Sequence, residues 1–381
     1  MNKRSVYLLS IGHLVTDLNQ GAIPAMLPFL VARYDLTYTA AAGIVFAANI
    51  TSSIVQPIFG HAADRFSKSW LLPLALLFAG FGVAMIGMVE SYYSILLLAG
   101  ISGVGIAAYH PEAARRVNLS GGEQKAESMS IFGIGGTLGF AAGPLYITSA
   151  LLWFDLKGSL CLLVPVSLVA VLIVKFLPNI QLTSGIKIKS DHELKEDAWR
   201  PFAFLSLCVT IRSVLFFGLL TFVPLYWVNV LGQTQTAGGI ALSIMTISGV
   251  IGNLIGGRLA DRIGNTRIIL VGFALLVPLV PLLIWVENPA IALLLLIPIG
   301  FALMATYAPA VVLGQKYLPN HIGFASGVTL GLAVAAGGIA APLLGRVADI
   351  HGLVTVLSGI AALPVVNIVI TCFLPEEPKT R

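Results

Sequence analysis

Long apolar runs separated by short polar segments follow one another along the whole chain of 381 residues. A helix that crosses the roughly 30 Å hydrocarbon layer of a bilayer needs about 20 predominantly apolar residues. The predicted spans are residues 6–32, 39–62, 70–89, 92–114, 126–152, 157–177, 200–230, 236–259, 267–286, 289–314, 322–347 and 352–374. The pattern therefore predicts an all-α membrane protein with about twelve transmembrane helices.

A repeat divides these spans into two halves. The polar stretch at residues 178–199, rich in Lys, Asp and Glu, separates the first six predicted spans from the last six. Motifs of the first half recur in the second at a nearly constant offset: Pro28 and Pro224, Gly60-His-Ala-Ala-Asp64-Arg65 and Gly257-Arg-Leu-Ala-Asp261-Arg262, Tyr109-His110-Pro111 and Tyr307-Ala-Pro309, Gly139-Phe-Ala-Ala-Gly143-Pro144 and Gly337-Gly-Ile-Ala-Ala341-Pro342. We expect six-helix halves at 1–177 and 200–381, a linker at 178–199, and a central site between the halves.

Composition and charge agree with a membrane protein. Hydrophobic residues make up 57% of the chain and charged residues 10%, whereas soluble domains carry about a quarter charged residues. Of the 22 Lys and Arg residues, Arg33, Lys157 and Arg346 fall in loops on one side and Arg212 falls within a span; the others lie with the termini, the linker and the loops of the other side. Because basic residues accumulate on cytoplasmic loops, we expect an inner-membrane protein with both termini cytoplasmic.

Several function classes find no support in the sequence. The net charge of +5 comes from these short loops, which favours topology signals over nucleic-acid binding. Cys161, Cys208 and Cys372 lie in apolar segments without metal-ligand spacing, so no disulfide, metal or cofactor is expected. The sequence lacks a phosphate-binding loop, a metalloprotease motif and a nucleophile with a paired base, and it has no sizeable soluble domain. These absences argue against an ATPase, an enzyme and a receptor.

The Gly-x-x-x-Asp-Arg element after the second and eighth spans resembles the cytoplasmic loop signature of the major facilitator superfamily. The resemblance covers the whole chain and implies the major facilitator fold. Within that family, Gly12-His13-Leu-Val-Thr-Asp17, Tyr109-His110-Pro111-Glu112 and Ser120-Gly121-Gly122 are similar to the fosmidomycin-resistance exporters. The segment Gly139-x-x-x-Gly143-Pro144 is similar to a motif of proton-driven antiporters.

Asp17 lies near the middle of the first predicted span, where an unpaired carboxylate is costly and usually has a role. His13, Asp17, Gln20 and Pro24 fall on one narrow face of that helix. We expect Asp17, with His13, to bind and release a proton as the cavity switches sides; the alternative is a structural polar contact between helices.

His110 and Glu112, near the cytoplasmic end of the fourth span, are further candidates for proton coupling. The alternatives are a hydrogen-bonded structural histidine, and a local ion pair of Glu112 with Arg115 or Arg116. In the second half the residues equivalent to His13, Asp17, His110 and Glu112 are Val209, Ser213, Ala308 and Ala310. Proton handling is therefore assigned to the first half.

Arg212 lies at mid-depth in the seventh span, one position from the equivalent of Asp17. It could bind an anionic substrate through a bidentate contact, or it could neutralise Asp17 across the cavity. The remaining polar positions predicted to line the substrate cavity are Gln20, Asn49, Gln56, Tyr109 and Tyr307. Hydrogen bonding between helices is an equally good account of the polar residues on the second span.

Two further groups have expected mechanical roles. Asp64-Arg65 and Asp261-Arg262 are interpreted as conformational latches at the cytoplasmic end, with solvated loop charge as the alternative. Gly139, Gly143 and Pro144, with Gly135, form a small-x-x-x-small pattern that predicts close helix packing.

The sequence thus predicts a monomeric, proton-coupled antiporter that exports a small polar or anionic compound, a fosmidomycin-like drug by resemblance. Its expected partners are the lipid bilayer, a small-molecule substrate and protons. A proton symporter or a uniporter for uptake of a small metabolite is the alternative, because Asp17 and Arg212 would serve it equally well.

Overall fold

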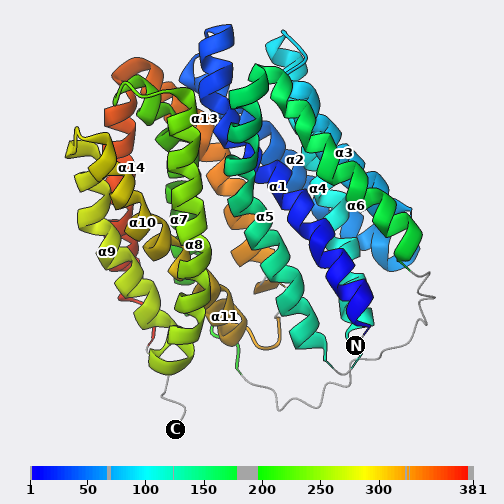
Figure 1. The fold of residues 1–381 in the computed structure, drawn as a ribbon. Coiled ribbons are helices and arrows are strands. Elements are labelled where there is room, and N and C mark those ends of the chain that lie inside the picture. Colours follow the sequence, from blue (N-terminus) through cyan, green and yellow to red (C-terminus); the bar gives the residue numbers. More distant parts are fainter. Residues whose placement is uncertain are drawn as a thin grey trace.

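The computed structural model describes residues 2–66, 70–122, 124–177, 196–321, 324–325 and 327–375, and within these ranges every regular element is helical (Figure 1). The first half contains α1 (Lys3–Tyr34), α2 (Tyr38–Phe66), α3 (Leu71–Ile86), α4 (Tyr92–Ser120), α5 (Lys125–Phe154), the 3-10 helix η1 (Asp155–Leu162) and α6 (Leu163–Phe176). The second contains α7 (Trp199–Asn229), α8 (Gln235–Ile263), α9 (Asn265–Trp285), α10 (Pro289–Ala305), α11 (Tyr307–Tyr317), the π-helix η2 (Gly327–Leu332), α13 (Ala333–His351) and α14 (Leu353–Thr371).

Each of the twelve predicted spans corresponds to one of these helices or to two consecutive ones. Among the described residues, nine segments are long and apolar enough to cross a membrane, one of which joins α5 to α6, and α3 is a shorter apolar helix. The helices α10 and α11 form one crossing interrupted at Thr306, and η2 continues into α13. The prediction of a twelve-helix membrane fold is therefore confirmed.

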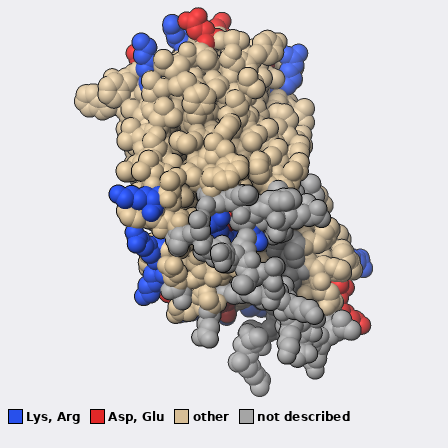
Figure 2. Space-filling view, turned by 90° about the vertical axis from the view of Figure 1, so that its right-hand side faces the viewer, with Lys and Arg blue, Asp and Glu red and all other residues tan. Residues whose placement is uncertain are grey.

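The surface matches a bilayer in its distribution of charge and aromatic rings. Figure 2 shows a broad band without Lys, Arg, Asp or Glu below a charged upper end, and further charged residues toward the other end. Tyr93, Trp153 and Trp285 are about four-fifths exposed, at 81%, 79% and 78%, and each lies at the end of a long helix. Amphipathic rings favour such positions, where headgroups meet hydrocarbon.

The halves lie side by side in Figure 1, with α1 to α6 on the right and α7 to α14 on the left. They meet mainly through two helix pairs, because α2 packs on α13 and α5 packs on α8. The start of α1 lies beside the end of α4, where the Asn2 N–H donates to the Ser120 carbonyl at 2.7 Å. This end of the molecule is the one predicted to be cytoplasmic; residues 178–195 of the predicted linker lie outside the described part of the chain.

A row of glycines on α5 places that helix directly against α1. A Cβ atom added to Gly135, Gly139 or Gly143 would meet the backbone carbonyl of Ser10, Leu14 or Leu18, respectively. Both rows advance four residues at a time, so they run along one face of each helix. Close backbone approach through small residues is the usual way in which membrane helices associate, and here it fixes α1, which carries the central polar residues.

We predict that Gly139→Val destabilises the protein and that Gly133→Val does not. Both changes place the same β-branched residue in α5, but Gly133 has no atom within 4 Å of an added Cβ, whereas Gly139 would press on Leu14. Overpacking of this kind costs roughly 1–3 kcal/mol. The measurement is the melting temperature of the purified proteins in detergent, and equal melting temperatures for the two variants would contradict the packing argument.

Candidate functional site

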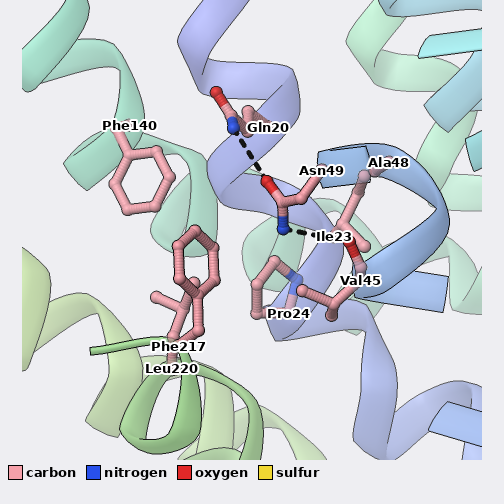
Figure 3. Close-up of a pocket in the computed structure, with 9 residues that line it drawn as sticks. All are labelled: Gln20, Ile23, Pro24, Val45, Ala48, Asn49, Phe140, Phe217 and Leu220. Atoms are coloured by element: carbon pink, nitrogen blue, oxygen red, sulfur yellow. Dashed lines mark hydrogen bonds between the residues drawn. The ribbon is translucent and has the colours of Figure 1, made fainter. Parts of the chain in front are cut away.

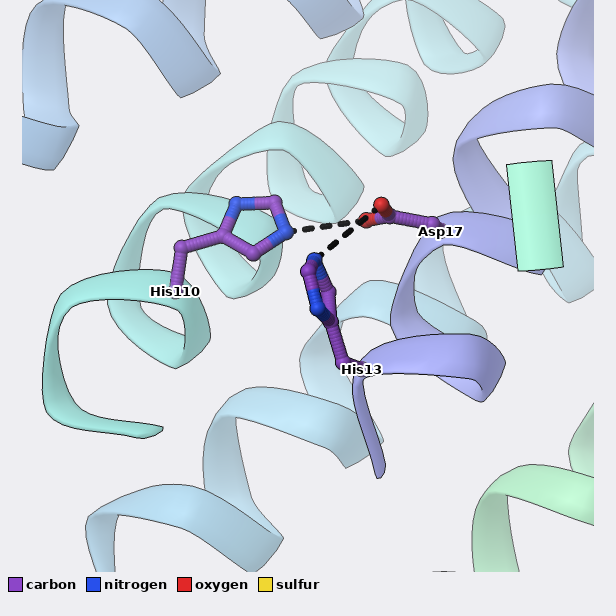
Figure 4. Close-up of side chains that lie close together, drawn as sticks. All are labelled: His13, Asp17 and His110. Atoms are coloured by element: carbon purple, nitrogen blue, oxygen red, sulfur yellow. Dashed lines mark hydrogen bonds and ion pairs between the residues drawn. The ribbon is translucent and has the colours of Figure 1, made fainter. Parts of the chain in front are cut away.

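Three of the residues predicted for proton coupling lie together at the middle of the first half (Figure 4). His13 and Asp17 lie one turn apart on α1, and His110 reaches them from α4. The Nε2 atom of His110 is 2.9 Å from Oδ1 of Asp17, and Nε2 of His13 is 3.2 Å from Oδ2. Their side chains are 13–20% exposed, so the carboxylate is held by two imidazoles in a largely dry site.

The orientation of His13 places a proton in this cluster. Its Nδ1 is 2.8 Å from the carbonyl oxygen of Phe132, and its ring stacks on the Phe132 ring at 4.0 Å. A carbonyl oxygen only accepts hydrogen bonds, so Nδ1 carries a hydrogen. In a neutral ring Nε2 would then present a lone pair to the Asp17 carboxylate. The 3.2 Å contact is favourable only when a proton lies between these two groups.

The same three side chains offer a set of ligand atoms that a transition metal could accept. One nitrogen from each histidine and one carboxylate oxygen lie within 4.8 Å of one another. Two imidazoles and a carboxylate suit several divalent metals. The arrangement therefore has two chemical uses, the holding of a proton and the holding of a divalent cation.

Gly136 on α5 makes room for the cluster. A Cβ atom at this position would lie 2.7 Å from Oδ2 of Asp17 and would also meet the His13 ring. In the sequence this glycine stands within a run that indicates helix packing, and its neighbour Gly135 does lie against α1. Its role beside the carboxylate depends on the angle between α1 and α5, for which the sequence holds no signal.

Two other predicted residues of α4 lie apart from the cluster. Glu112 is fully buried and forms an ion pair with Arg116, whose Nε is 2.6 Å from Oε1. Tyr109 is also fully buried, and its hydroxyl donates to the carbonyl of Leu9 on α1 at 2.9 Å. Glu112 is thus paired within α4, and Tyr109 joins α4 to α1.

Arg212 lies apart from this cluster, in the second half. Its Nε donates to the Thr306 hydroxyl at 2.8 Å, and Nη2 donates to the Leu303 carbonyl at 3.2 Å. The guanidinium lies 5.0 Å from the ring centroid of Tyr307, a cation–π arrangement. The side chain is 5% exposed and has no carboxylate partner among the described residues. Buried arginine without a carboxylate is unusual, because burying a charge is costly unless it is paired.

The structure does not pair Asp17 with Arg212 directly. The partners of Asp17 are the two histidines, and those of Arg212 come from the junction of α10 and α11. Tyr307, at the start of α11, packs against the Arg212 guanidinium. The carboxylate therefore lies in the first half with its two histidines, and the guanidinium lies in the second half beside Tyr307.

The other polar candidates lie around and beyond this region. The Gln20 amide donates to the Asn49 side-chain oxygen at 3.1 Å and so joins α1 to α2. Figure 3 shows these two side chains opposite Phe140 of α5 and Phe217 of α7. The residues border a hollow of about 10 Å³ between the halves, room for about one water molecule. Gln56, two turns beyond Asn49 on α2, is exposed.

The predicted latch residues remain untested. Asp261 and Arg262 are exposed at the end of α8, which agrees equally with a latch and with solvated charge. The side chains of Asp64 and Arg65 lie outside the described part of the structure. Pro144 follows Gly143 within the continuous helix α5.

A bundle of membrane-spanning helices in two halves, with charged side chains in the interior of each half, is the architecture of a polytopic membrane transporter. Residues 9–342 match the model of the Major Facilitator Superfamily, so the chain belongs to that family. It is therefore a multi-pass secondary transporter and not an enzyme.

Similar proteins are known in sequence and in structure. The MFS-type transporter YfnC of Bacillus subtilis is 29% identical, with 98% of this chain and 93% of the relative covered. The fosmidomycin resistance protein of Escherichia coli is 26% identical, with 97% and 92% covered. Among solved structures, an inward-facing, occupied bacterial homologue of the human lysosomal transporter Spinster aligns with a TM-score of 0.81 at 13% identity, covering 97% of this chain and 96% of that one. The nucleoside transporter NupG aligns with a TM-score of 0.78 at 16% identity, covering 97% and 99%.

We predict that Tyr109→Phe lowers stability and leaves transport unchanged. The change removes one buried hydrogen bond to Leu9, worth about 1 kcal/mol, and alters no group in contact with Asp17. The melting temperature and the transport rate in proteoliposomes are the two measurements. A large loss of transport at unchanged stability would place Tyr109 in the transport pathway.

Proposed function

We propose that this protein is a proton-coupled antiporter that exports a small polar or anionic compound, with the cluster of His13, Asp17 and His110 as its proton site. The observation that carries the proposal is the contact of His13 with Asp17, which needs a proton because Nδ1 is committed to Phe132. Loss of that proton leaves two acceptors facing each other. Repulsion between these acceptors then favours a rearrangement of helices α1, α4 and α5.

Export is supported by the named functions of relatives. The fosmidomycin resistance protein covers nearly the whole chain, and the multidrug resistance protein MdtG of Dickeya zeae is 25% identical over 75% of it. Both names describe resistance, which an exporter gives by lowering the drug concentration in the cell. Those similarities support export as the proposed direction of transport.

Exchange of substrate for a proton requires that the two exclude each other. A substrate with an anionic group and a hydrogen-bond donor could place the anion on Arg212, beside Tyr307, and the donor on Asp17. The donor would then take the place of the proton that His13 shares with Asp17. Binding of substrate would release the proton, and binding of a proton would release the substrate.

One observation favours the alternative, a proton symporter. Because Arg212 is not bonded to Asp17, an anion without a hydrogen-bond donor could bind Arg212 while the cluster keeps its proton. Anion and proton would then move together. A probable 4-methylmuconolactone transporter of Cupriavidus pinatubonensis, 24% identical over 82% of this chain, is among the relatives. The direction of transport under a pH gradient separates the two functions.

We predict that Asp17→Asn abolishes transport driven by a pH gradient. The amide keeps the shape of the carboxyl group but cannot take up a proton at neutral pH. The measurement is the transport of radiolabelled fosmidomycin by proteoliposomes with an imposed pH gradient. A chelator keeps divalent metals off the histidine and aspartate ligands of the cluster. Asp35→Asn, at an exposed position after α1, is the control and should retain the wild-type response. A gradient response that survives Asp17→Asn would remove Asp17 from the coupling mechanism.

We also predict that Arg212→Ala raises the half-saturating concentration of fosmidomycin, a phosphonate, by about ten- to a hundredfold, the range for loss of a hydrogen bond to a charged group. Arg212→Lys should lie between wild type and Arg212→Ala, because lysine keeps the charge but loses the planar fork. The dependence of the initial transport rate on concentration gives the value. An unchanged half-saturation in Arg212→Ala would show that the anion binds elsewhere.

A further inference from the structure

At the end of the molecule away from the start of α1, a carboxylate of the second half forms hydrogen bonds with the first half. Asp349, in the last turn of α13, accepts hydrogen bonds from the backbone N–H of Tyr38 at 2.6 Å and of Thr39 at 3.1 Å. The Tyr38 N–H donates to Oδ1, and both the N–H and the hydroxyl of Thr39 donate to Oδ2. All three donors lie in the first turn of α2, so a residue of one half caps a helix of the other.

The chemistry of a helix start explains why a carboxylate fits there. The first N–H groups of a helix have no partner within the helix, and they form the positive end of its dipole. Thr37 accepts from the N–H of Ala40 at 3.1 Å, which leaves the N–H groups of Tyr38 and Thr39 to Asp349. The first turn of α2 therefore depends on the second half for two of its hydrogen bonds.

The equivalent helix of the second half is capped differently. At the start of α8, Thr234 accepts from the N–H of Ala237 at 3.2 Å. Within the described residues, no carboxylate of the first half is bonded to this turn. The contact between α5 and α8 at this end is instead a close approach of Gly239 to Thr148. The carboxylate cap is thus specific to the pair of α2 and α13.

The backbones of α2 and α13 also touch beside the cap. A Cβ atom added to Gly345, one turn before Asp349, would lie 2.7 Å from the Tyr38 carbonyl oxygen and 2.8 Å from the Thr39 Cα. The glycine lets α13 approach the start of α2 closely enough for the short Asp349 side chain to reach it. Both observations place the same two turns in direct contact.

We propose that Asp349 is the latch that holds the transporter closed at this end. In this family the halves rock against each other, so α2 and α13 must separate here before the central site opens to this side. Separation breaks all three hydrogen bonds to Asp349 at once. Because Asp349, Tyr38 and Thr39 are partly exposed, water can take over the released groups, and the latch is reversible. The proposal rests on alternating access alone and needs neither the proton site nor a particular substrate.

The test measures the separation of the halves at this end. Spin labels are attached to cysteines at the exposed positions Glu90 and His351, one in each half, after serine replaces Cys161, Cys208 and Cys372. Pulsed electron paramagnetic resonance on the full chain in nanodiscs then gives the distribution of label distances. We expect Asp349→Ala to lower the ratio of the short-distance to the long-distance population by about tenfold or more, as loss of hydrogen bonds to a charged group predicts.

Two further variants distinguish a latch from general stabilisation. Asp349→Asn keeps one acceptor oxygen and should give a smaller shift than Asp349→Ala, and it replaces that variant if the latter does not fold. Asp35→Asn removes an exposed carboxylate near the same end and should leave the distances unchanged. Distances in both Asp349 variants that match wild type, with or without a lower melting temperature, would overturn the proposal.

Discussion

A carboxylate at the middle of a membrane-spanning helix must be held by groups that share a proton or a positive charge with it, and the first half is arranged around this requirement. Asp17 lies between the imidazoles of His13 and His110. The hydrogen bond of the Phe132 carbonyl with Nδ1 fixes the orientation of the His13 ring. Gly136 has no side chain and so leaves space for His13 and Asp17. Helices α1, α4 and α5 each contribute to this one contact, so their close packing and the chemistry of the site are parts of the same arrangement.

The positive charge, on Arg212, lies in the other half and is bonded to neutral groups. Arg212 is bonded to a hydroxyl, a carbonyl and the face of Tyr307. Had it paired with Asp17, the two halves would be held together by a buried ion pair, which is costly to break because each charge is then left alone. Separate partners avoid that cost. Each half can keep its charged group satisfied while the halves move.

The sequence was sufficient to predict the fold. Of its four candidates for proton coupling, the structure brings His13, Asp17 and His110 together, whereas Glu112 pairs with Arg116. Periodicity and the repeat predict the twelve helices, and the cost of a buried charge singles out Asp17 and Arg212 without any structure. The pairing of Asp17 with His110 joins residues far apart in the chain, and it follows from the packing of α1 on α4. Glu112 and His110 are equally good candidates for proton coupling in the sequence. In the structure they lie on different faces of α4, so His110 contacts Asp17 and Glu112 contacts Arg116. The cap of α2 by Asp349 joins residues of the two halves that are far apart in the chain, so no local sequence pattern predicts it.

The repeat helps to explain why the halves share packing but differ in chemistry. Gly337 of α13 is the counterpart of Gly139, and a Cβ atom there would meet Ser213, the counterpart of Asp17, on α7. One glycine of the row thus recurs in the equivalent helix pair of the second half, where Ala333 and Ala341 stand in place of Gly135 and Gly143. At this contact the second half has the small hydroxyl group of Ser213, and its positive charge lies one position away at Arg212. A framework fixed by backbone contact can accept different side chains at the site it encloses, so one half of a repeated protein can specialise in proton binding while the other provides the positive charge.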